Sequence, residues 1–277
     1  MIKSLIWVLN HPNNKNNKFI TILRLLWWKT NQIFFKFPSV IELKKGVRYI
    51  AYPDSSFGGL VVYTRLPEFY EMNYFDSIIE PGDTVIDVGV HMGDYSLLAA
   101  SNISSGRVLA FEPSKEALRV LSQNIAINDY GQKVKVYPVA ALDRNGNIDF
   151  EDNDRSEISH VDFSKTSKKI IKVKTIKIDD VISDESIRSV KIAKIDVEGA
   201  ELLVLKGMRE SLAKKIIKQL LVEVNSDCEN YGILPEDTFN FIRSFGYKLY
   251  YFSDEGKLKK LTTFPTNKKY INILARI

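Results

Sequence analysis

The chain contains 277 residues, of which 45% are hydrophobic and 26% charged, with 14 glycines and 9 prolines. This composition excludes collagen-like, low-complexity and disordered proteins, and it allows one or two domains with full cores. The single cysteine, Cys228, excludes an internal disulfide framework and a cysteine-rich zinc site, and it fits a reducing compartment.

The N-terminal segment carries most of the positive charge. Residues 1–50 hold nine Lys or Arg and one acid (net +8), whereas the whole chain has a net charge of +5, so the remainder carries −3. The pattern predicts a loop at residues 11–18 and a helix at 19–37 with apolar residues nearly all round. We treat residues 1–59 as a basic, Trp-rich helical arm that ends in a lead-in strand.

Two interpretations of the predicted helix at residues 19–37 remain open. It either docks its apolar side on the main domain or makes peripheral contact with a membrane or a partner. No nucleic-acid motif accompanies the charge, so nucleic acid is not an expected partner. No stretch has the roughly 18 consecutive apolar residues of a membrane span, and no signal peptide is recognisable, so we expect a cytoplasmic protein that is soluble or peripherally membrane-associated.

Beyond the arm, short strands are predicted at 47–52 and 60–63, and a helix begins at Pro67. A regular alternation then follows. Its strands are predicted at 84–88, 107–111, 134–139, 190–196 and 219–224, and its helices at 93–101, 114–128, 199–212 and 235–245. Residues 145–177 interrupt it, with a strand at 171–177. Two last strands, 247–252 and 270–275, have no helix between them. This order predicts an α/β fold in residues 60–277: a doubly wound, mostly parallel seven-stranded sheet with a C-terminal antiparallel hairpin.

Acidic residues stand at the carboxyl ends of the predicted parallel strands, where an open α/β sheet binds its ligands. Buried strands exclude acids, so their recurrence at strand ends indicates a binding site. They stand in the segments Asp87-Val88-Gly89, Phe111-Glu112-Pro113, Asp196-Val197-Glu198-Gly199 and Glu223-Val224-Asn225. Ala140-Ala141 occupies the corresponding position after the third strand of the alternation.

The first of these segments reads Asp87-Val-Gly-Val-His-Met-Gly93 between a strand and a helix. Gly89 permits a tight turn, and the helix that starts at Gly93 offers free N–H groups. Glu112 ends the next strand, where an acid can accept both ribose hydroxyls of a nucleoside. The third glycine of a diphosphate-binding loop is missing, which counts against a nicotinamide cofactor and favours S-adenosylmethionine.

Three segments resemble the FkbM-type S-adenosylmethionine-dependent methyltransferases, a family with the class I, Rossmann-like fold. They read VIDVGVHMGDYSLLAA at residues 85–100, FEPSKEALRVLSQNIAIND at 111–129 and, most specifically, KIDVEGAELLVLKGM at 194–208. The likeness runs from about Leu60 to the C-terminus. The sequence departs from the family at Val90-His91, where Ala-Asn is usual, so the role of that Asn is not carried over.

The resemblance and the strand-end positions together give the candidates below, and His91, which stands where the sequence departs from the family, is added because an imidazole titrates near neutrality. Cofactor-binding candidates are Asp87, Gly89, Val90, Gly93, Tyr95, Ser96, Glu112, Pro113, Ala140, Ala141 and Asp196. Catalytic candidates are Asp196, Glu198 and His91, and acceptor-binding candidates are Glu198, Glu201 and Glu223. We expect no metal, because no His, Cys or acid spacing specifies one.

Structural explanations compete at three of these positions. Glu201 stands in a first helical turn, where an acid stabilises the macrodipole; Glu223 could be a buried, paired acid; and His91 could be a bystander in its loop.

The resemblance implies O-methylation of a sugar or another hydroxylated metabolite, with residues 145–177 and the arm shaping the acceptor pocket. The alternatives are a nicotinamide-dependent oxidoreductase and a non-catalytic cofactor-binding module held on a membrane or partner by the N-terminal helix. The sequence does not indicate an oligomeric state.

Overall fold

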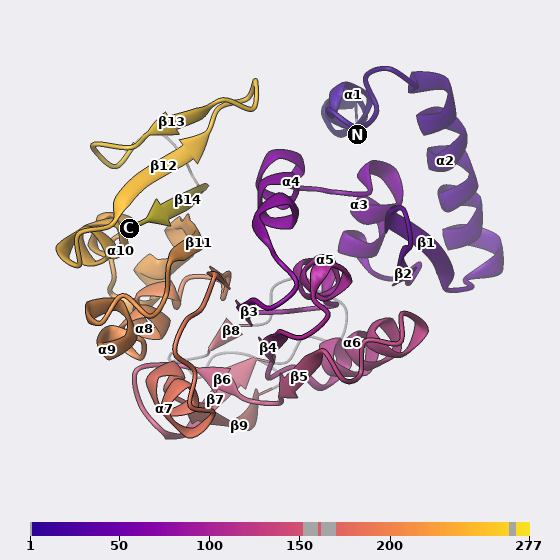
Figure 1. The fold of residues 1–277 in the computed structure, drawn as a ribbon. Coiled ribbons are helices and arrows are strands. Elements are labelled where there is room, and N and C mark those ends of the chain that lie inside the picture. Colours follow the sequence, from indigo (N-terminus) through magenta and orange to yellow (C-terminus); the bar gives the residue numbers. More distant parts are fainter. Residues whose placement is uncertain (1, 152–159, 162–169, 266–269) are drawn as a thin grey trace.

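An eight-stranded sheet forms the centre of the computed structural model, which describes residues 2–151, 160–161, 170–265 and 270–277 (Figure 1). The strand order is β13-β12-β14-β11-β10-β3-β4-β5. The five strands from β5 to β11 run parallel, and β14, β12 and β13 each pair antiparallel with their neighbours. Their bounds are β3 (Thr84–Val88), β4 (Arg107–Phe111), β5 (Val134–Tyr137), β10 (Ile192–Ile195), β11 (Gln219–Asn225), β12 (Lys248–Phe252), β13 (Leu258–Lys260) and β14 (Tyr270–Arg276).

The predicted α/β class and the mostly parallel sheet are confirmed, with one more strand than the predicted seven. The additional strand is β13, which pairs with β12 at the edge of the sheet. A turn at Gly256, with φ +78°, folds the chain back so that Leu258–Lys260 can pair. Three residues with the sequence LKK carry no recognisable alternation, so the sequence pattern did not predict this strand.

Helices cover both faces of the sheet, because its strand side chains alternate between two cores. On one face, α4 (Phe69–Ile78), α5 (Asp94–Asn102) and α6 (Lys115–Ile127) pack against residues such as Val85 and Val108. On the other, α7 (Ile178–Asp184), α8 (Glu201–Lys206), α9 (Arg209–Ala213) and α10 (Pro235–Ser244) pack against residues such as Ile86 and Leu109. This doubly wound arrangement leaves the carboxyl ends of the parallel strands free to carry a site.

The N-terminal residues form α1 (Ile2–Asn10), α2 (Lys18–Thr30), a π-helical turn η1 (Asn31–Phe35) and the hairpin of β1 (Ser39–Lys44) and β2 (Val47–Ala51). The helix predicted at 19–37 is therefore present as α2 and its π-helical continuation. Within the described part of the chain, no helix is long and apolar enough to cross a bilayer.

The strand predicted at residues 60–63 is wrong, because this segment belongs to helix α3 (Ser56–Thr64). The Ser55 hydroxyl caps the helix by accepting a hydrogen bond from the Gly58 N–H at 2.9 Å. Gly59 brings α3 against the indole of the fully buried Trp28, since a Cβ there would lie 3.0 Å from Nε1. Capping and packing outweigh the strand preference of the apolar residues at 60–63. The division predicted between residues 59 and 60 falls inside this helix.

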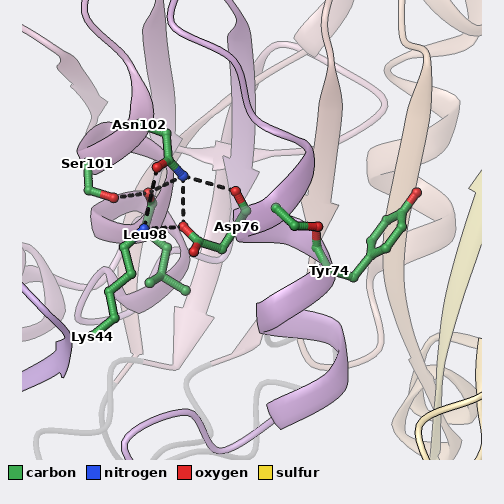
Figure 2. A network of polar contacts seen from close by, with 7 residues as sticks. Lys44, Tyr74, Asp76, Leu98, Ser101 and Asn102 are labelled. Atoms are coloured by element: carbon green, nitrogen blue, oxygen red, sulfur yellow. Dashed lines mark hydrogen bonds and ion pairs between the residues drawn. The ribbon is translucent and has the colours of Figure 1, made fainter.

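A polar network ties the β1–β2 hairpin to the helices beside it (Figure 2). The Lys44 ammonium contacts the Asp76 carboxylate of α4 and donates to Asn102 Oδ1 of α5 at 3.4 Å. The Asn102 amide in turn donates to the Asp76 carboxylate at 2.7 Å and to its carbonyl at 3.0 Å. The hairpin is thereby fixed to the domain by charge as well as by its buried face.

A second, four-stranded sheet interrupts the alternation, with the order β6-β9-β7-β8. Its strands are β6 (Ala140–Ala141), β7 (Gly146–Glu151), β8 (His160–Val161) and β9 (Ile170–Ile176), which confirms the strand predicted at 171–177. The rest of the predicted interruption, residues 152–159 and 162–169, lies outside the described residues. A small core that includes Phe150 and Ala200 holds this sheet against the main domain.

Candidate active site

A cavity of about 760 Å³ opens at the carboxyl ends of the parallel strands. Its lining includes residues that follow β3, β4 and β10 and Glu223 near the end of β11, so the predicted location at these strand ends is where the structure has its cavity. Arm residues such as Trp7, and Phe150 of the second sheet, complete the wall. The volume suits a cofactor-sized ligand, since ligand cavities measure roughly 300–1,000 Å³.

The loop after β3 is held by buried polar contacts. Asp87 is 2% exposed and accepts a hydrogen bond from Ser96 Oγ at 2.6 Å. Gly89 has φ +80°, and a Cβ there would lie 1.7 Å from the Asp196 carbonyl oxygen. Glycine is therefore required for the close approach of two neighbouring loops, and not only for the turn that the sequence predicted.

Glu112 connects the ends of β3 and β4. Its carboxylate accepts hydrogen bonds from the backbone N–H groups of His91 at 2.8 Å and Ser114 at 2.9 Å. Beside it the cavity wall is apolar, with Phe111, Val120, Pro113, Val139, Ala140 and Ala141 among the lining residues. A carboxylate next to an apolar wall suits a nucleoside, because the ribose needs acceptors and the base needs apolar contact.

Carboxylic acids dominate the charge of the cavity. Among the described lining residues nine are acids, whereas Lys194 alone carries an ammonium or guanidinium group. The acids are Asp54, Glu68, Asp87, Asp94, Glu112, Glu116, Asp196, Glu198 and Glu223. Such a field attracts cations and repels anions, most strongly where the walls are apolar.

Lys194 lies buried in the middle of this cluster, with 2% of its side chain exposed. Its ammonium donates to Asp196 Oδ2 at 2.9 Å and sits over the Tyr95 ring. Burial lowers the pKa of Lys194, but the charges of Asp196, Glu68 and Glu223 outweigh that effect and raise the pKa above its usual value. The side chain is therefore a permanent cation.

Two acids of the DVEGAE segment (residues 196–201), Glu198 and Glu201, have different surroundings. Glu198 lines the cavity from a backbone in the left-handed region, with φ 53°. Burial and the charges of Asp196, Glu201 and Asp227 raise its pKa to about 8. Glu201 does not line the cavity and is fully buried, and its Oε1 accepts hydrogen bonds from the N–H groups of Val197 at 3.1 Å and Gly199 at 3.0 Å.

The geometry separates the residues that line the cavity from those that support it. Twelve of the fifteen predicted site residues line the cavity. The other three are Gly93, whose Cβ position abuts Leu121, Ser96, which holds Asp87, and Glu201, which fixes the Val197–Gly199 turn. Glu201 thus follows the structural explanation rather than the predicted contact with an acceptor.

His91 lines the cavity with φ 51° and packs edge-on against Phe57. Burial lowers its pKa to about 4, against the opposing charge of Asp196. The imidazole is therefore neutral at physiological pH and a weak base, which makes His91 a poorer base candidate than Glu198.

The sequence did not single out Lys194, Glu68, Asp94 or Tyr270, which also line the cavity. Lys194 left a recognisable signal, because a lysine in the apolar strand IAKI needs an acidic partner. Glu68 gave none. It reaches the cavity as the residue before α4, and it accepts hydrogen bonds from Tyr95 Oη at 2.6 Å and from Asn272 Nδ2 at 2.5 Å.

The family profile described as "Methyltransferase FkbM domain" matches residues 87–249, which include the carboxyl ends of the five parallel strands β3, β4, β5, β10 and β11. This is more than half of the chain. The chain belongs to the FkbM methyltransferase family.

Relatives of this FkbM-family protein carry methyltransferase names. Methyltransferase sdnD of Sordaria araneosa is 24% identical over 225 residues, which cover 70% of this chain and 85% of that protein. The 2-O-methyltransferase NoeI of Sinorhizobium fredii is 28% identical over 177 residues, which cover 57% of this chain and 70% of that protein. The hexuronic acid methyltransferase AglP of Haloferax volcanii is 29% identical over 161 residues, which cover 57% of this chain and 60% of that protein.

Membership in this family makes the chain a methyltransferase with S-adenosylmethionine as its methyl donor. The cavity fits that donor in two respects. The Glu112 carboxylate beside an apolar wall suits its adenosine, and the excess of acids suits its positive charge. The described residues contain no cluster of three or more His, Cys, Asp or Glu arranged to hold a metal ion.

The raised carboxyl pKa values of this methyltransferase predict how its stability depends on pH. Burial raises the pKa of Glu198 and Glu223 to about 8, and that of Asp94 and Glu201 to about 7. The folded state then keeps protons that the unfolded chain releases, so the free energy of unfolding falls as pH rises toward 8. Buried His91 and His11, whose pKa values burial lowers, act in the opposite sense only below about pH 6.5.

We therefore expect the free energy of unfolding of the ligand-free protein to fall between about pH 6.5 and pH 8, by up to about 1.4 kcal/mol per pH unit for each retained proton, and the urea midpoint to fall with it. Glu198→Gln should flatten this dependence, whereas Glu229→Gln, at an exposed site, should leave it unchanged. A midpoint that rises through this window would show that these carboxyls are ionised in the folded state.

Proposed function

We propose that the protein methylates a hydroxyl group of an uncharged small molecule or saccharide. The observation that carries this proposal is one cavity that combines a nucleoside-type acid, Glu112, with the buried group of Asp196, Glu198, Glu223 and Lys194. The name of one relative specifies 2-O-methylation, which supports an oxygen acceptor, and another relative is named for a hexuronic acid, which supports a saccharide; that the acceptor is uncharged is inferred from the cavity alone.

The cofactor roles follow from the chemistry of each lining group. S-adenosylmethionine supplies an electrophilic methyl group on a cationic sulfonium. Glu112 would accept hydrogen bonds from the ribose hydroxyls, and Pro113, Ala140 and Ala141 would provide apolar contact for the base. Asp87 and Asp196 contribute negative charge where a cation is held, and Gly89 lets the two loops that carry them approach each other.

Glu198 is the base in this proposal. An acceptor hydroxyl that gains a methyl group must lose its proton, and a carboxylate at the cavity wall can take it. Because the pKa of Glu198 is raised to about 8, its ionised form is a stronger base than an exposed carboxylate. Lys194 holds Asp196 in place by its 2.9 Å hydrogen bond, and Glu223 remains to bind acceptor hydroxyls.

The charge of the cavity also restricts the ligands. Glu198, Glu223 and Asp94 retain protons near neutral pH, but six other acids still line the described cavity against one lysine, so an anionic acceptor or the diphosphate of a nicotinamide cofactor would be repelled. This argues for an uncharged acceptor and against the oxidoreductase alternative. A non-catalytic cofactor-binding module would keep the affinity for cofactor and lack turnover. The cytoplasmic location stays a prediction.

The test combines binding and turnover. We expect S-adenosylhomocysteine to bind wild type and Glu198→Gln within threefold of each other by calorimetry, since Glu198 acts on the acceptor. Transfer of a labelled methyl group to a panel of neutral methyl glycosides should fall about 10²–10⁴-fold in Glu198→Gln, the usual contribution of a general base. His91→Gln should reduce transfer far less.

Three outcomes would overturn parts of this proposal. No binding of either cofactor form by wild type removes the methyl-transfer function. Binding without transfer to any acceptor in the panel favours the non-catalytic module. Full activity of Glu198→Gln together with loss of activity in His91→Gln moves the base to the histidine.

A further inference from the structure

The N-terminal arm carries most of the apolar surface that the described structure exposes. Of 17 exposed large apolar side chains, 14 lie within the first 40 residues. We call the exposed apolar side chains of residues 5–37 the arm surface. Its most exposed members are Phe34 at 74%, Phe19 at 73%, Phe37 at 67%, Ile33 at 64% and Leu26 at 60%.

The polarity of the arm is inverted relative to a helix that docks through its apolar side. Polar side chains face the domain: Arg24 Nη1 donates to the Tyr63 carbonyl at 3.3 Å, and Gln32 Nε2 donates to the Pro53 carbonyl at 2.8 Å. Thr21 and Asn31 are also on the buried side, where Trp28 is the one large apolar residue of α2 that is fully buried. The contacts with the domain thus leave the apolar side of α2 facing outward, at the edge of the molecule in Figure 1.

Such a surface is unfavourable in water, because it is larger and more continuous than the scattered apolar residues of soluble proteins. Its charge indicates what covers it. Residues 1–41 contain six Lys or Arg and no acid, and Lys18, Lys29 and Lys36 are exposed beside the apolar side chains. Trp, Phe and Leu flanked by lysine are typical of helices that lie in the headgroup region of anionic bilayers.

A second copy of the chain fits this surface less well. A two-fold interface places the same patch on both partners, so the lysines of one arm would face those of the other with no acid in residues 1–41 to balance them. No helix of the described residues can cross a bilayer, which leaves an interfacial position for the arm.

We propose that the arm surface docks the protein on an anionic phospholipid bilayer, with α1, α2 and residues 31–37 lying in the membrane interface. Trp7 belongs both to this surface and to the wall of the cavity. The docked protein would therefore hold one edge of its cavity against the lipid headgroups. This inference is independent of the reaction proposed above, because it rests on the arm alone.

Tryptophan fluorescence reports directly on this docking. All three tryptophans, Trp7, Trp27 and Trp28, lie in the arm, and Trp7 and Trp27 are about half exposed, at 48% and 49%. With vesicles of phosphatidylglycerol and phosphatidylcholine, we expect a blue shift of the emission and quenching by brominated acyl chains. Vesicles of phosphatidylcholine alone, or high salt, should weaken binding at least tenfold.

Two variants form a matched pair. Leu26→Glu lies in the arm surface, and Leu234→Glu lies at the start of α10, with exposed fractions of 60% and 59% in the parent side chains. We expect Leu26→Glu to lower vesicle affinity at least tenfold and Leu234→Glu to leave it within twofold, with equal circular dichroism and melting temperature. Equal sedimentation of the two variants with vesicles would overturn the proposal. So would a dimer, seen by light scattering, that Leu26→Glu dissociates while wild type shows no quenching by lipid.

Discussion

Lys194→Met should lower the free energy of unfolding by about 1–3 kcal/mol at pH 8, because it removes a buried charged donor, 2% exposed, from Asp196, whose side chain is 30% exposed. The Lys194 ammonium is 2.9 Å from Asp196 Oδ2 and is the single cation among the described residues that line the cavity. Its removal leaves Asp196 and Glu223 to face each other across a buried space. Urea unfolding followed by circular dichroism measures the change.

The pH dependence identifies the cause of this loss. Burial, together with the charges of Asp196, Glu68 and Glu198, already raises the pKa of Glu223 to about 8 against the opposing charge of Lys194. Without Lys194 these carboxyls should take up further protons, so the destabilisation should shrink as pH is lowered toward 5, where protonation relieves their repulsion. A packing defect alone would be independent of pH.

Lys191→Met provides the matched control. Lys191 is in the same stretch of chain, but its ion pairs with Glu80 and Asp83 are at 3.5 Å and its side chain is 22% exposed. We expect a loss of at most about 1 kcal/mol there, as for partly exposed pairs. Equal effects of the two substitutions would mean that Lys194 is not held by the acids around it.

The fold was predictable where local pattern and tertiary burial agree. The strands β3, β4 and β10 are continuous apolar runs between turn residues, and their order along the chain requires crossover helices. Prediction failed at α3, where the cap at Ser55 and the contact with Trp28 decide between strand and helix. The contact between Gly59 and Trp28 joins residues far apart in the sequence, and such a contact leaves no periodic signal.

The residues of the cavity likewise divide into those that the sequence predicted and those that it did not. Asp87, Glu112, Asp196 and Glu198 were predicted because each lies at or just after the carboxyl end of a parallel strand, and strand ends converge whatever the details of packing. Glu68 reaches the cavity only because α4 packs over the sheet beside Tyr95. The outward direction of the arm surface was likewise not predictable, since hydrogen bonds from Arg24 and Gln32 to distant carbonyls decide it.

Glu112→Gln should weaken the binding of S-adenosylhomocysteine about 100-fold. In the proposed role, Glu112 accepts hydrogen bonds from the ribose hydroxyls as a carboxylate, and hydrogen bonds to charged groups contribute roughly 1.5–3 kcal/mol each. Glutamine keeps the shape and one acceptor oxygen, so a net loss of about 2–3 kcal/mol is expected rather than the sum of both bonds. Calorimetric titration measures the affinity directly.

Glu112 also supports the loops themselves, and this second role must be separated from the first. Its carboxylate accepts from the N–H groups of His91 and Ser114, so an amide in its place leaves one buried donor without its acceptor. That defect should lower the free energy of unfolding by about 1–3 kcal/mol. The melting temperature of the ligand-free variant gives this contribution independently of binding.

Glu116→Gln is the control for charge in the same cavity. Glu116 lines it from the first turn of α6, pairs with Arg119 at the surface and is 42% exposed, so its replacement should change affinity less than twofold. If both variants weaken binding equally, the general negative field of the cavity attracts the cofactor and Glu112 has no special contact. If Glu112→Gln alone loses affinity while both remain folded, the carboxylate after β4 binds the ribose, and the nucleoside end of the cavity is located.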